Sequence, residues 1–344
     1  MAEAAAAPLE PVAALVTTVE ANFCRVRLEQ PGPQAVDQLL CVRRTRLGKA
    51  GQRICVGDRV QVEGIDWTAR RGAIAAVAER SSLLPRPAVA NVSRVVVVVA
   101  LEQPSLDPLQ LTRFLLTAEA TGAAVELVLT KADLLSPEQR QAWRQRLQGW
   151  GYEPLLVAAR QGLGLEPLRQ RLARPGISVL CGPSGVGKSS LINALLPELQ
   201  LRVSAVSGRL QRGRHTTRHV ELFPLGPAAL LADTPGFNRP ELPVDPAALG
   251  PLFPEIRERL GQACCRFRNC LHQGDPDCAV GDGWDRYPLY RSCLEAALVA
   301  SAAEPGRSEA AAGLKQRGHR HEQRLDQRQR QPSRRRRRQG EPEG

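Results

Sequence analysis

A glycine-rich stretch, set between an apolar run and a helical pattern, has the residue types needed to hold a phosphate chain. Ile177 to Cys181 suits a buried strand, and Ser190 opens a helical pattern. The pattern G-x-x-x-x-G-K-[ST] is met between them by Gly182, Pro183, Ser184, Gly185, Val186, Gly187, Lys188 and Ser189. The glycines let backbone N–H groups turn toward phosphate oxygens. We expect these residues, with Ser190, to bind phosphates: Lys188 would reach the β- and γ-phosphates, and the Ser189 hydroxyl would ligate Mg²⁺. A chance match is the alternative, against which the strand–loop–helix context argues.

A second group of residues could read the base of a nucleotide. Thr130, Lys131 and Asp133 end an apolar run that begins at Val125. An aspartate here can accept hydrogen bonds from N1–H and the amino group of guanine, which adenine does not offer. In GTPases the motif is Asn-Lys-x-Asp, so a threonine stands in the place of the asparagine. We expect guanine selection to persist and the asparagine's tethering bonds to be partly lost. A Lys-x-Asp turn is common by itself, and only its combination with the phosphate loop makes it informative.

Two further segments could complete a nucleotide site. Asp233 to Gly236 reads Asp-Thr-Pro-Gly after an apolar run, and Gly213 to Arg218 is a polar stretch that fits a switch loop. Asp233 would hold Mg²⁺ through water, Gly236 would sense the γ-phosphate, and Thr217 would complete the Mg²⁺ shell. A simple turn after a strand is the alternative for the Asp-Thr-Pro-Gly segment, because these residue types favour turns.

Four residues near the C-terminal end have the types and spacing of metal ligands. Cys265, Cys270, His272 and Cys278 lie within 14 residues in the pattern C-x₄-C-x-H-x₅-C. Three thiolates and one imidazole make a closed tetrahedral Zn²⁺ site, which is structural because no position is left for water. Cys264 is a fifth candidate that fits the spacing less well. Buried, unligated cysteines are the alternative.

Strand and helix patterns alternate around the phosphate loop, which predicts an α/β domain with a mainly parallel sheet over residues 91–239. The base-reading group precedes the phosphate loop, whereas ordinary GTPases have the phosphate loop first. The order therefore indicates a circularly permuted P-loop GTPase domain. We expect strands and helices at Val95–Ala100, 108–121, Val125–Thr130, 137–148, Leu155–Ala158, Leu165–Leu172, Ile177–Cys181, Val220–Leu225 and Ala229–Ala232.

The segments on either side predict three further parts, so the chain is multidomain. Short alternating strands over residues 11–80 favour a small all-β barrel of the OB-fold type, whose arginines contact RNA or form an ordinary solvated face. Residues 81–91 read as a linker. Residues 240–300 predict a small, mainly helical zinc-binding domain, with Trp284, Tyr287 and Tyr290 in its core. Residues 301–344 predict a disordered, arginine-rich tail that grips RNA or has no specific role.

Charge and cysteine usage narrow the choice of partners and compartment. The formal net charge of +12 favours an anionic partner, and about half of this excess lies in residues 301–344. The N-terminus is acidic and lacks a signal peptide pattern, and the longest apolar run is too short to span a bilayer. We expect a cytoplasmic protein without a membrane partner. In that reducing compartment, clustered cysteines suggest a metal site rather than disulfides.

Taken together, these motifs resemble the RsgA family of circularly permuted GTPases. The resemblance rests on ERSSLLPRPAVAN, TKAD, GPSGVGKSSLINAL, GRHTTR, DTPGF and the cysteine–histidine pattern, and it covers about Val12 to Leu298. It implies an OB-fold, a permuted GTPase domain and a zinc domain. It also implies hydrolysis of GTP to GDP, stimulated by the 30S ribosomal subunit and its rRNA, late in small-subunit maturation. The alternative is an RNA-binding assembly factor that uses GTP mainly as a structural ligand. We expect the protein to act as a monomer.

The position after Asp-x-x-Gly indicates how hydrolysis would proceed. A glutamine there orients the attacking water in Ras-type enzymes, but here the residue is Phe237, which has no donor or acceptor. We therefore expect slow intrinsic hydrolysis, with Lys188 and Thr217 in the catalytic machinery and His215 as the group that positions water. The alternative is that His215 contacts RNA or solvent and that rRNA positions the water.

Overall fold

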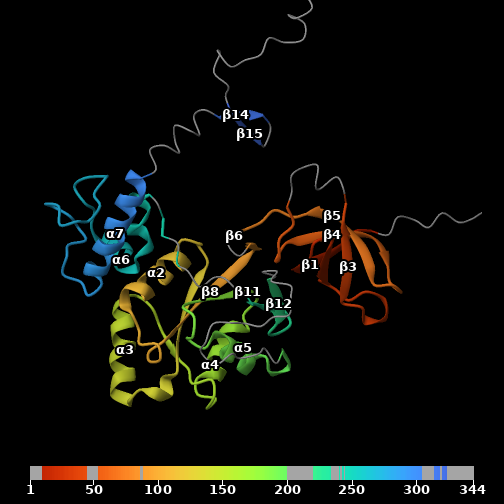
Figure 1. The fold of residues 1–344 in the computed structure, drawn as a ribbon, viewed down its shortest axis with the longest axis horizontal. Helices are drawn as coiled ribbons and strands as arrows, with labels where there is room; N and C mark the ends of the chain where they lie inside the picture. Colours follow the sequence, from red (N-terminus) through yellow and green to blue (C-terminus); the bar gives the residue numbers. More distant parts are fainter. Residues whose placement is uncertain are drawn as a thin grey trace, which may run out of the picture.

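Three folded parts lie side by side in the computed structural model (Figure 1). The structure describes residues 10–44, 53–85, 88–199, 220–233, 240, 242–243, 245–303, 314–317 and 320–323. A β-barrel lies at one end of a central sheet covered by helices, and a small helical part lies beside α2 and α3 at the other end. The central part thus separates the other two.

The barrel is closed by five strands. They are β1 (Val12–Val19), β2 (Phe23–Leu28), β3 (Gln38–Arg43), β4 (Arg59–Asp66) and β5 (Arg71–Val77). Their order is β1-β2-β3-β5-β4, and β4 returns to pair with β1. Alternate residues such as Val16, Val26 and Cys41 point inward and are fully buried, which is why the alternating sequence forms a barrel. The expected OB-like barrel is confirmed.

The central sheet continues in the order β10-β9-β8-β11-β13-β12, with only β12 antiparallel to its neighbour. Its strands are β8 (Val92–Ala100), β9 (Ala124–Thr130), β10 (Leu155–Leu156), β11 (Gly176–Cys181), β12 (Glu221–Pro224) and β13 (Ala229–Asp233). Helices α2 (Pro108–Glu119) and α3 (Pro137–Gly149) share a core with one face, and α4 (Leu165–Leu172) and α5 (Lys188–Leu195) share a core with the other. The residues expected to bind nucleotide follow the carboxyl ends of β9, β11 and β13, where ligands bind in such sheets.

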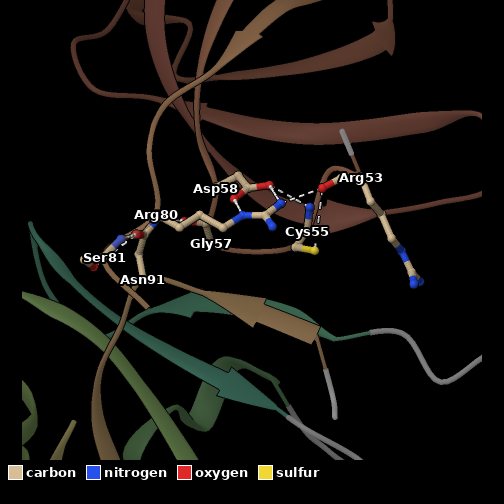
Figure 2. A network of polar contacts seen from close by, with 7 residues as sticks. All are labelled: Arg53, Cys55, Gly57, Asp58, Arg80, Ser81 and Asn91. Atoms are coloured by element: carbon tan, nitrogen blue, oxygen red, sulfur yellow. Dashed lines mark hydrogen bonds and ion pairs between the residues drawn. The ribbon is translucent and has the colours of Figure 1, made fainter. Parts of the chain in front are cut away.

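The segment expected to be a linker is instead an ordered joint between barrel and sheet. It forms a hairpin of β6 (Leu83–Pro85) and β7 (Ala88–Ala90). Figure 2 shows the polar network beside it, in which the fully buried carboxylate of Asp58 accepts two hydrogen bonds from Arg80, at 2.7 and 2.9 Å. Asn91 accepts from the backbone N–H of Ser81 and donates to the Gly57 carbonyl. Polar side chains that are typical of a linker in the sequence therefore form the hydrogen bonds that hold the barrel against the sheet.

Gly57 and Val56 extend this joint into the core of the sheet. Gly57 has φ of +86°, and a Cβ there would clash with the Ala90 carbonyl oxygen, so only glycine allows the barrel to approach this closely. Val56, its neighbour, is buried in the same apolar cluster as Val95 and Val97 of β8. In addition, β1 pairs with β12 at Thr18 and Glu221, which makes one continuous 11-stranded sheet.

The helical part is built around α6 (Pro254–Gln262) and α7 (Tyr287–Ala302), with short 3-10 turns at Pro246–Ala248 and Gly250–Leu252. Aromatic rings fill its core: Phe253 meets Trp284 and Tyr290 edge-on, at centroid distances of 5.8 and 5.2 Å. Tyr287 is partly buried against the same cluster, as the sequence predicts. We call this part, residues 245–303, the metal module.

Beyond α7 the described residues form one hairpin, β14 (Leu314–Arg317) with β15 (Arg320–Gln323). In the part of the chain that the structure describes, no helix combines the length and the apolar character that crossing a membrane requires.

Candidate functional site

The phosphate loop joins β11 to α5 and is shaped by close backbone contacts. Gly182 has φ of +142°, and a Cβ at this position would collide with the carbonyl oxygen of Val98 on the neighbouring strand. Lys188 opens α5 and folds back over the loop, where its ammonium group donates to the carbonyls of Gly182 (2.7 Å) and Pro183 (2.6 Å). The lysine is thereby held beside the N-terminus of the helix, where phosphate oxygens bind.

The base-reading loop is tied directly to the phosphate loop through Thr130. Its hydroxyl oxygen lies 2.5 Å from the carbonyl oxygen of Val186 and 3.1 Å from that of Val99. The residue is buried, with 3% of its surface exposed. The sequence suggests that threonine loses part of the tethering that asparagine provides, yet this hydroxyl reaches the phosphate loop. Strands β9 and β11, which lead into the two loops, lie on either side of β8, and the hydroxyl faces the Val99 carbonyl of β8 as well as that of Val186.

Lys131 makes a second tie between the same loops. Its Nζ donates to the Gly185 carbonyl at 3.0 Å and also to the carbonyl of Gln103, in the loop that follows β8. Lys131 itself has φ of +55°, which turns the chain so that Asp133 is exposed to solvent. The backbone N–H of Ala132 donates to the Val157 carbonyl and so connects this loop to the end of β10. The Gln103 contact was missed in the sequence because it uses a backbone carbonyl, which no residue pattern marks.

The remaining nucleotide residues are described only in part. Asp233 ends β13, which runs parallel to β11 and pairs with β12 through the register of Asp233 with Glu221. His215, Thr217 and Gly236 lie outside the described residues. Their roles stay predictions, as does the role of Phe237.

The cysteine–histidine pattern closes into one compact cluster. The ligand atoms of Cys265, Cys270, His272 and Cys278 all lie within 4.8 Å of one another. The Nδ1 atom of His272 lies 3.5, 3.6 and 3.5 Å from the three sulfurs, and two sulfurs lie 3.9 Å apart. Tetrahedral Zn²⁺ with its usual bond lengths requires about 3.6 Å between nitrogen and sulfur and about 3.8 Å between sulfurs. The geometry thus fits a tetrahedral metal, and Cys264 is an exposed thiol outside the cluster.

The environment of His272 suits a neutral ligand. The side chain is buried, and loss of solvation lowers its pKa. A lowered pKa keeps the imidazole unprotonated, which is the form that binds metal. The other ring edge packs near Gly250, 3.4 to 3.6 Å from where a Cβ would lie. The cluster can therefore hold a metal ion.

A buried arginine, which the sequence does not mark, sits between the metal module and the central sheet. Arg286 is completely buried, and its guanidinium carbon lies 4.6 to 5.6 Å from the ring centroids of Trp150, Tyr152 and Phe253. Its charge is met by Glu255 at 2.5 Å. Among so many arginines in the sequence, nothing distinguishes this one, because its environment comes from segments more than 100 residues apart.

Strand order, loop positions and motif order together define a circularly permuted P-loop GTPase with an OB-like barrel and a candidate metal centre. A family model described as RsgA GTPase matches residues 77–243. The chain is 58% identical over 292 residues to the protein named Small ribosomal subunit biogenesis GTPase RsgA from Synechococcus sp. (strain CC9311), covering 85% of this chain and 96% of the relative. It is 53% identical over 291 residues to the protein of that name from Thermosynechococcus vestitus, covering 85% and 83%.

Solved structures agree with this assignment. The crystal structure of YjeQ from Thermotoga maritima matches with a TM-score of 0.70 and 28% identity, covering 84% of this chain and 99% of that one. YloQ, described as a circularly permuted GTPase, matches with a TM-score of 0.69 and 28% identity, covering 86% and 96%. The chain belongs to the RsgA family of GTPases.

Proposed function

We propose that this protein hydrolyses GTP to GDP and phosphate as a step in the maturation of the small ribosomal subunit. The observation that carries the proposal is the direct connection of the two loops: Thr130 and Lys131 contact the carbonyls of Val186 and Gly185. A base-reading loop that is hydrogen-bonded to the phosphate loop can bind a whole guanine nucleotide rather than a phosphate group alone. The cellular role rests on relatives whose printed name is Small ribosomal subunit biogenesis GTPase and which the chain matches over most of their length.

The nucleotide would lie across the carboxyl ends of β9, β11 and β13. Asp133 would accept from guanine, and Lys188 would exchange the carbonyls of Gly182 and Pro183 for phosphate oxygens. Ser189, Thr217 and Asp233 would hold Mg²⁺, whose charge offsets that of the phosphates. Gly236 would sense the γ-phosphate.

Hydrolysis transfers the γ-phosphoryl group to water. The water oxygen bonds to the γ-phosphorus, the bond from that phosphorus to the β–γ bridging oxygen breaks, and the proton of water passes to a base or to phosphate. We infer that His215 orients this water and accepts its hydrogen bond, because Phe237 cannot. The ribosomal subunit would order the loop that carries His215.

The cysteine–histidine cluster would hold one structural Zn²⁺. The Nδ1–sulfur distances of 3.5 to 3.6 Å support this metal, and four protein ligands leave no place for a reacting water. Zinc would thus stabilise the metal module rather than take part in hydrolysis.

The barrel offers a surface for RNA. Arg25 and Arg43 are exposed on β2 and β3, and Phe23, with 39% of its surface exposed, lies two residues before Arg25 on β2 and pairs with Val42 of β3. Arginines together with an exposed aromatic ring are typical of surfaces that bind the phosphates and bases of single strands. The 30S subunit and its rRNA are therefore the partners that we propose, with the protein acting as a monomer in the cytoplasm.

Base selection tests the nucleotide site. We expect Asp133→Asn to weaken GTP binding at least about tenfold, because two hydrogen bonds to a charged acceptor are lost. The same variant should gain affinity for XTP, whose extra carbonyl can accept from an amide. Competition binding with GTP, XTP and ATP measures this. Equal affinity of the unaltered protein for GTP and ATP would remove the role given to Asp133.

Phosphate release separates an enzyme from a factor that holds GTP as a structural ligand. We expect slow release from the protein alone and much faster release with purified 30S subunits. No increase, despite GTP-dependent binding to the subunit, would favour the structural-ligand hypothesis.

His215→Ala should abolish the stimulated hydrolysis rate in single turnover, with GTP affinity and 30S binding retained. An unchanged rate would mean that another group positions the water.

A further inference from the structure

Helix α2 belongs to two apolar cores at once. Leu111, Phe114 and Leu115 are buried in the core of the central sheet. On the other side of the helix, Leu116 is buried in the core of the metal module, and Leu109 packs against that same core. The metal module is therefore not an appended domain, because one of its core residues comes from the GTPase part. Metal ligand Cys278 packs against this cluster too.

Polar contacts lock the same two parts together. Asp285, next to the buried Arg286, accepts hydrogen bonds from Arg146 and from the indole N–H of Trp150, each at 2.7 Å. Arg257 of α6 donates to Glu119 at the end of α2, at 3.0 Å. Separating the parts would break these contacts and would also take the Arg286 guanidinium away from the rings of Trp150 and Tyr152. The metal module and α2 thus move together.

The first turn of α2 leads directly into the nucleotide site. The carboxylate of Asp107 caps the helix by accepting from the N–H of Leu109. The preceding loop places the Gln103 carbonyl on the ammonium group of Lys131 and brings Pro104 to 4.0 Å from where a Cβ of Gly185 would lie. Leu109, which packs on the metal module, is thus six residues from a carbonyl that fixes a base-reading residue.

We propose that the metal module, acting through Leu109, is a positioning element of the nucleotide site, so that metal and guanine nucleotide bind cooperatively. With the metal bound, Leu109 has a formed core to pack on, and the loop before it holds Lys131 over the phosphate loop. Without the metal, the three cysteines and His272 are no longer held together, and Leu109 loses the core on which it packs. Lys131 must then be ordered by the nucleotide itself. Preorganisation lowers the cost of binding, so metal removal weakens nucleotide affinity. This inference rests on the proposed function, since it needs both ligands.

Cooperativity of this kind is reciprocal. If metal raises the affinity for GDP by some factor, GDP raises the affinity for metal by the same factor. Couplings between sites are typically about 5- to 150-fold. We therefore expect zinc removal to weaken GDP binding at least fivefold, GDP to raise the affinity for zinc by the same factor, and bound GDP to slow zinc loss.

The experiment uses the full-length holoprotein and two readouts other than activity. GDP affinity is measured by calorimetry before and after zinc is removed with a chelator. Zinc loss to a coloured chelator is followed with and without saturating GDP, which keeps the test valid if the stripped protein unfolds. Leu109→Ala should retain its zinc, bind GDP more weakly and lose the effect of GDP on zinc loss. Leu260→Ala, an exposed leucine of α6 outside the shared core, should retain the coupling.

The outcomes separate the inference from the proposed function. Independent zinc and GDP binding in the unaltered protein, with zinc loss at the same rate with and without GDP, would overturn the coupling alone. Full coupling in the Leu109→Ala variant would overturn the path through α2. A holoprotein that contains no zinc or does not bind GDP would instead overturn the proposed function on which the coupling rests.

Discussion

The hydroxyl of Thr130 connects the base-reading loop to the phosphate loop through a single residue. It faces two backbone carbonyls, those of Val99 and Val186, in surroundings closed to solvent. Since one hydroxyl donates one hydrogen, the shorter contact with Val186 is the tie between the loops. The sequence shows that a threonine replaces the usual asparagine here, but only the neighbouring carbonyls show what the threonine hydroxyl binds.

We expect Thr130→Val to weaken GDP binding by about 5- to 150-fold. The isosteric change removes the donor and leaves a buried carbonyl without a partner, which costs roughly 1–3 kcal/mol. Thr130→Ser should restore most of the affinity. Thr112→Val is the matched control, because its buried hydroxyl has no hydrogen-bond partner among the residues that the structure describes, and this variant should bind GDP normally. Unchanged calorimetric affinity in Thr130→Val would mean that Lys131 alone joins the loops.

At the scale of elements, the joint between barrel and sheet departs most from what the sequence suggests. Proline, serine and asparagine in residues 81–91 are typical of a linker, but here they form a hairpin and a polar network. Local residue types could not predict this, because Asp58 and Gly57, the partners of Arg80 and Asn91, come from the barrel.

We expect Arg80→Met to lower the free energy of unfolding by about 3 kcal/mol, because it leaves the buried Asp58 carboxylate without its cation. Chemical denaturation measures the change. Arg59→Met, an exposed arginine of the same barrel, should cost little. The double variant Asp58→Asn with Arg80→Met should recover part of the loss, and if it is no better than Arg80→Met alone, the ion pair does not hold the joint.

At the scale of the whole molecule, the three parts share their cores. Val56 of the barrel segment is buried with the central sheet, and Leu116 of the central part is buried with the metal module. We expect the zinc-bound protein to unfold on heating in one transition, with calorimetric and van't Hoff enthalpies in agreement. A separate early transition of the metal module, seen by scanning calorimetry, would show that the shared helix does not couple the parts.

The sequence predicts most of this architecture, and the limits have a common cause. Alternation identifies β1 and β2, and glycine and lysine spacing identifies the phosphate loop, because these depend on neighbours along the chain. The aromatic rings and the carboxylate around Arg286, and the packing of α2 against two cores, depend on segments that meet only in the folded protein. The helical pattern of α2 shows which residues are apolar, but not which core each one enters.

The sharing of α2 between two cores also has a consequence for synthesis, because the chain emerges from its N-terminus. The barrel strands end at Val77 and can close early. Strand β8 must wait for β11, and the side of α2 that carries Leu116 must wait for Phe253 and Tyr290 of the metal module. At 5–20 residues per second, that side stays uncovered for on the order of 10 to 40 s. The completion of the core on this side of α2 therefore depends on how soon the ribosome delivers the metal module.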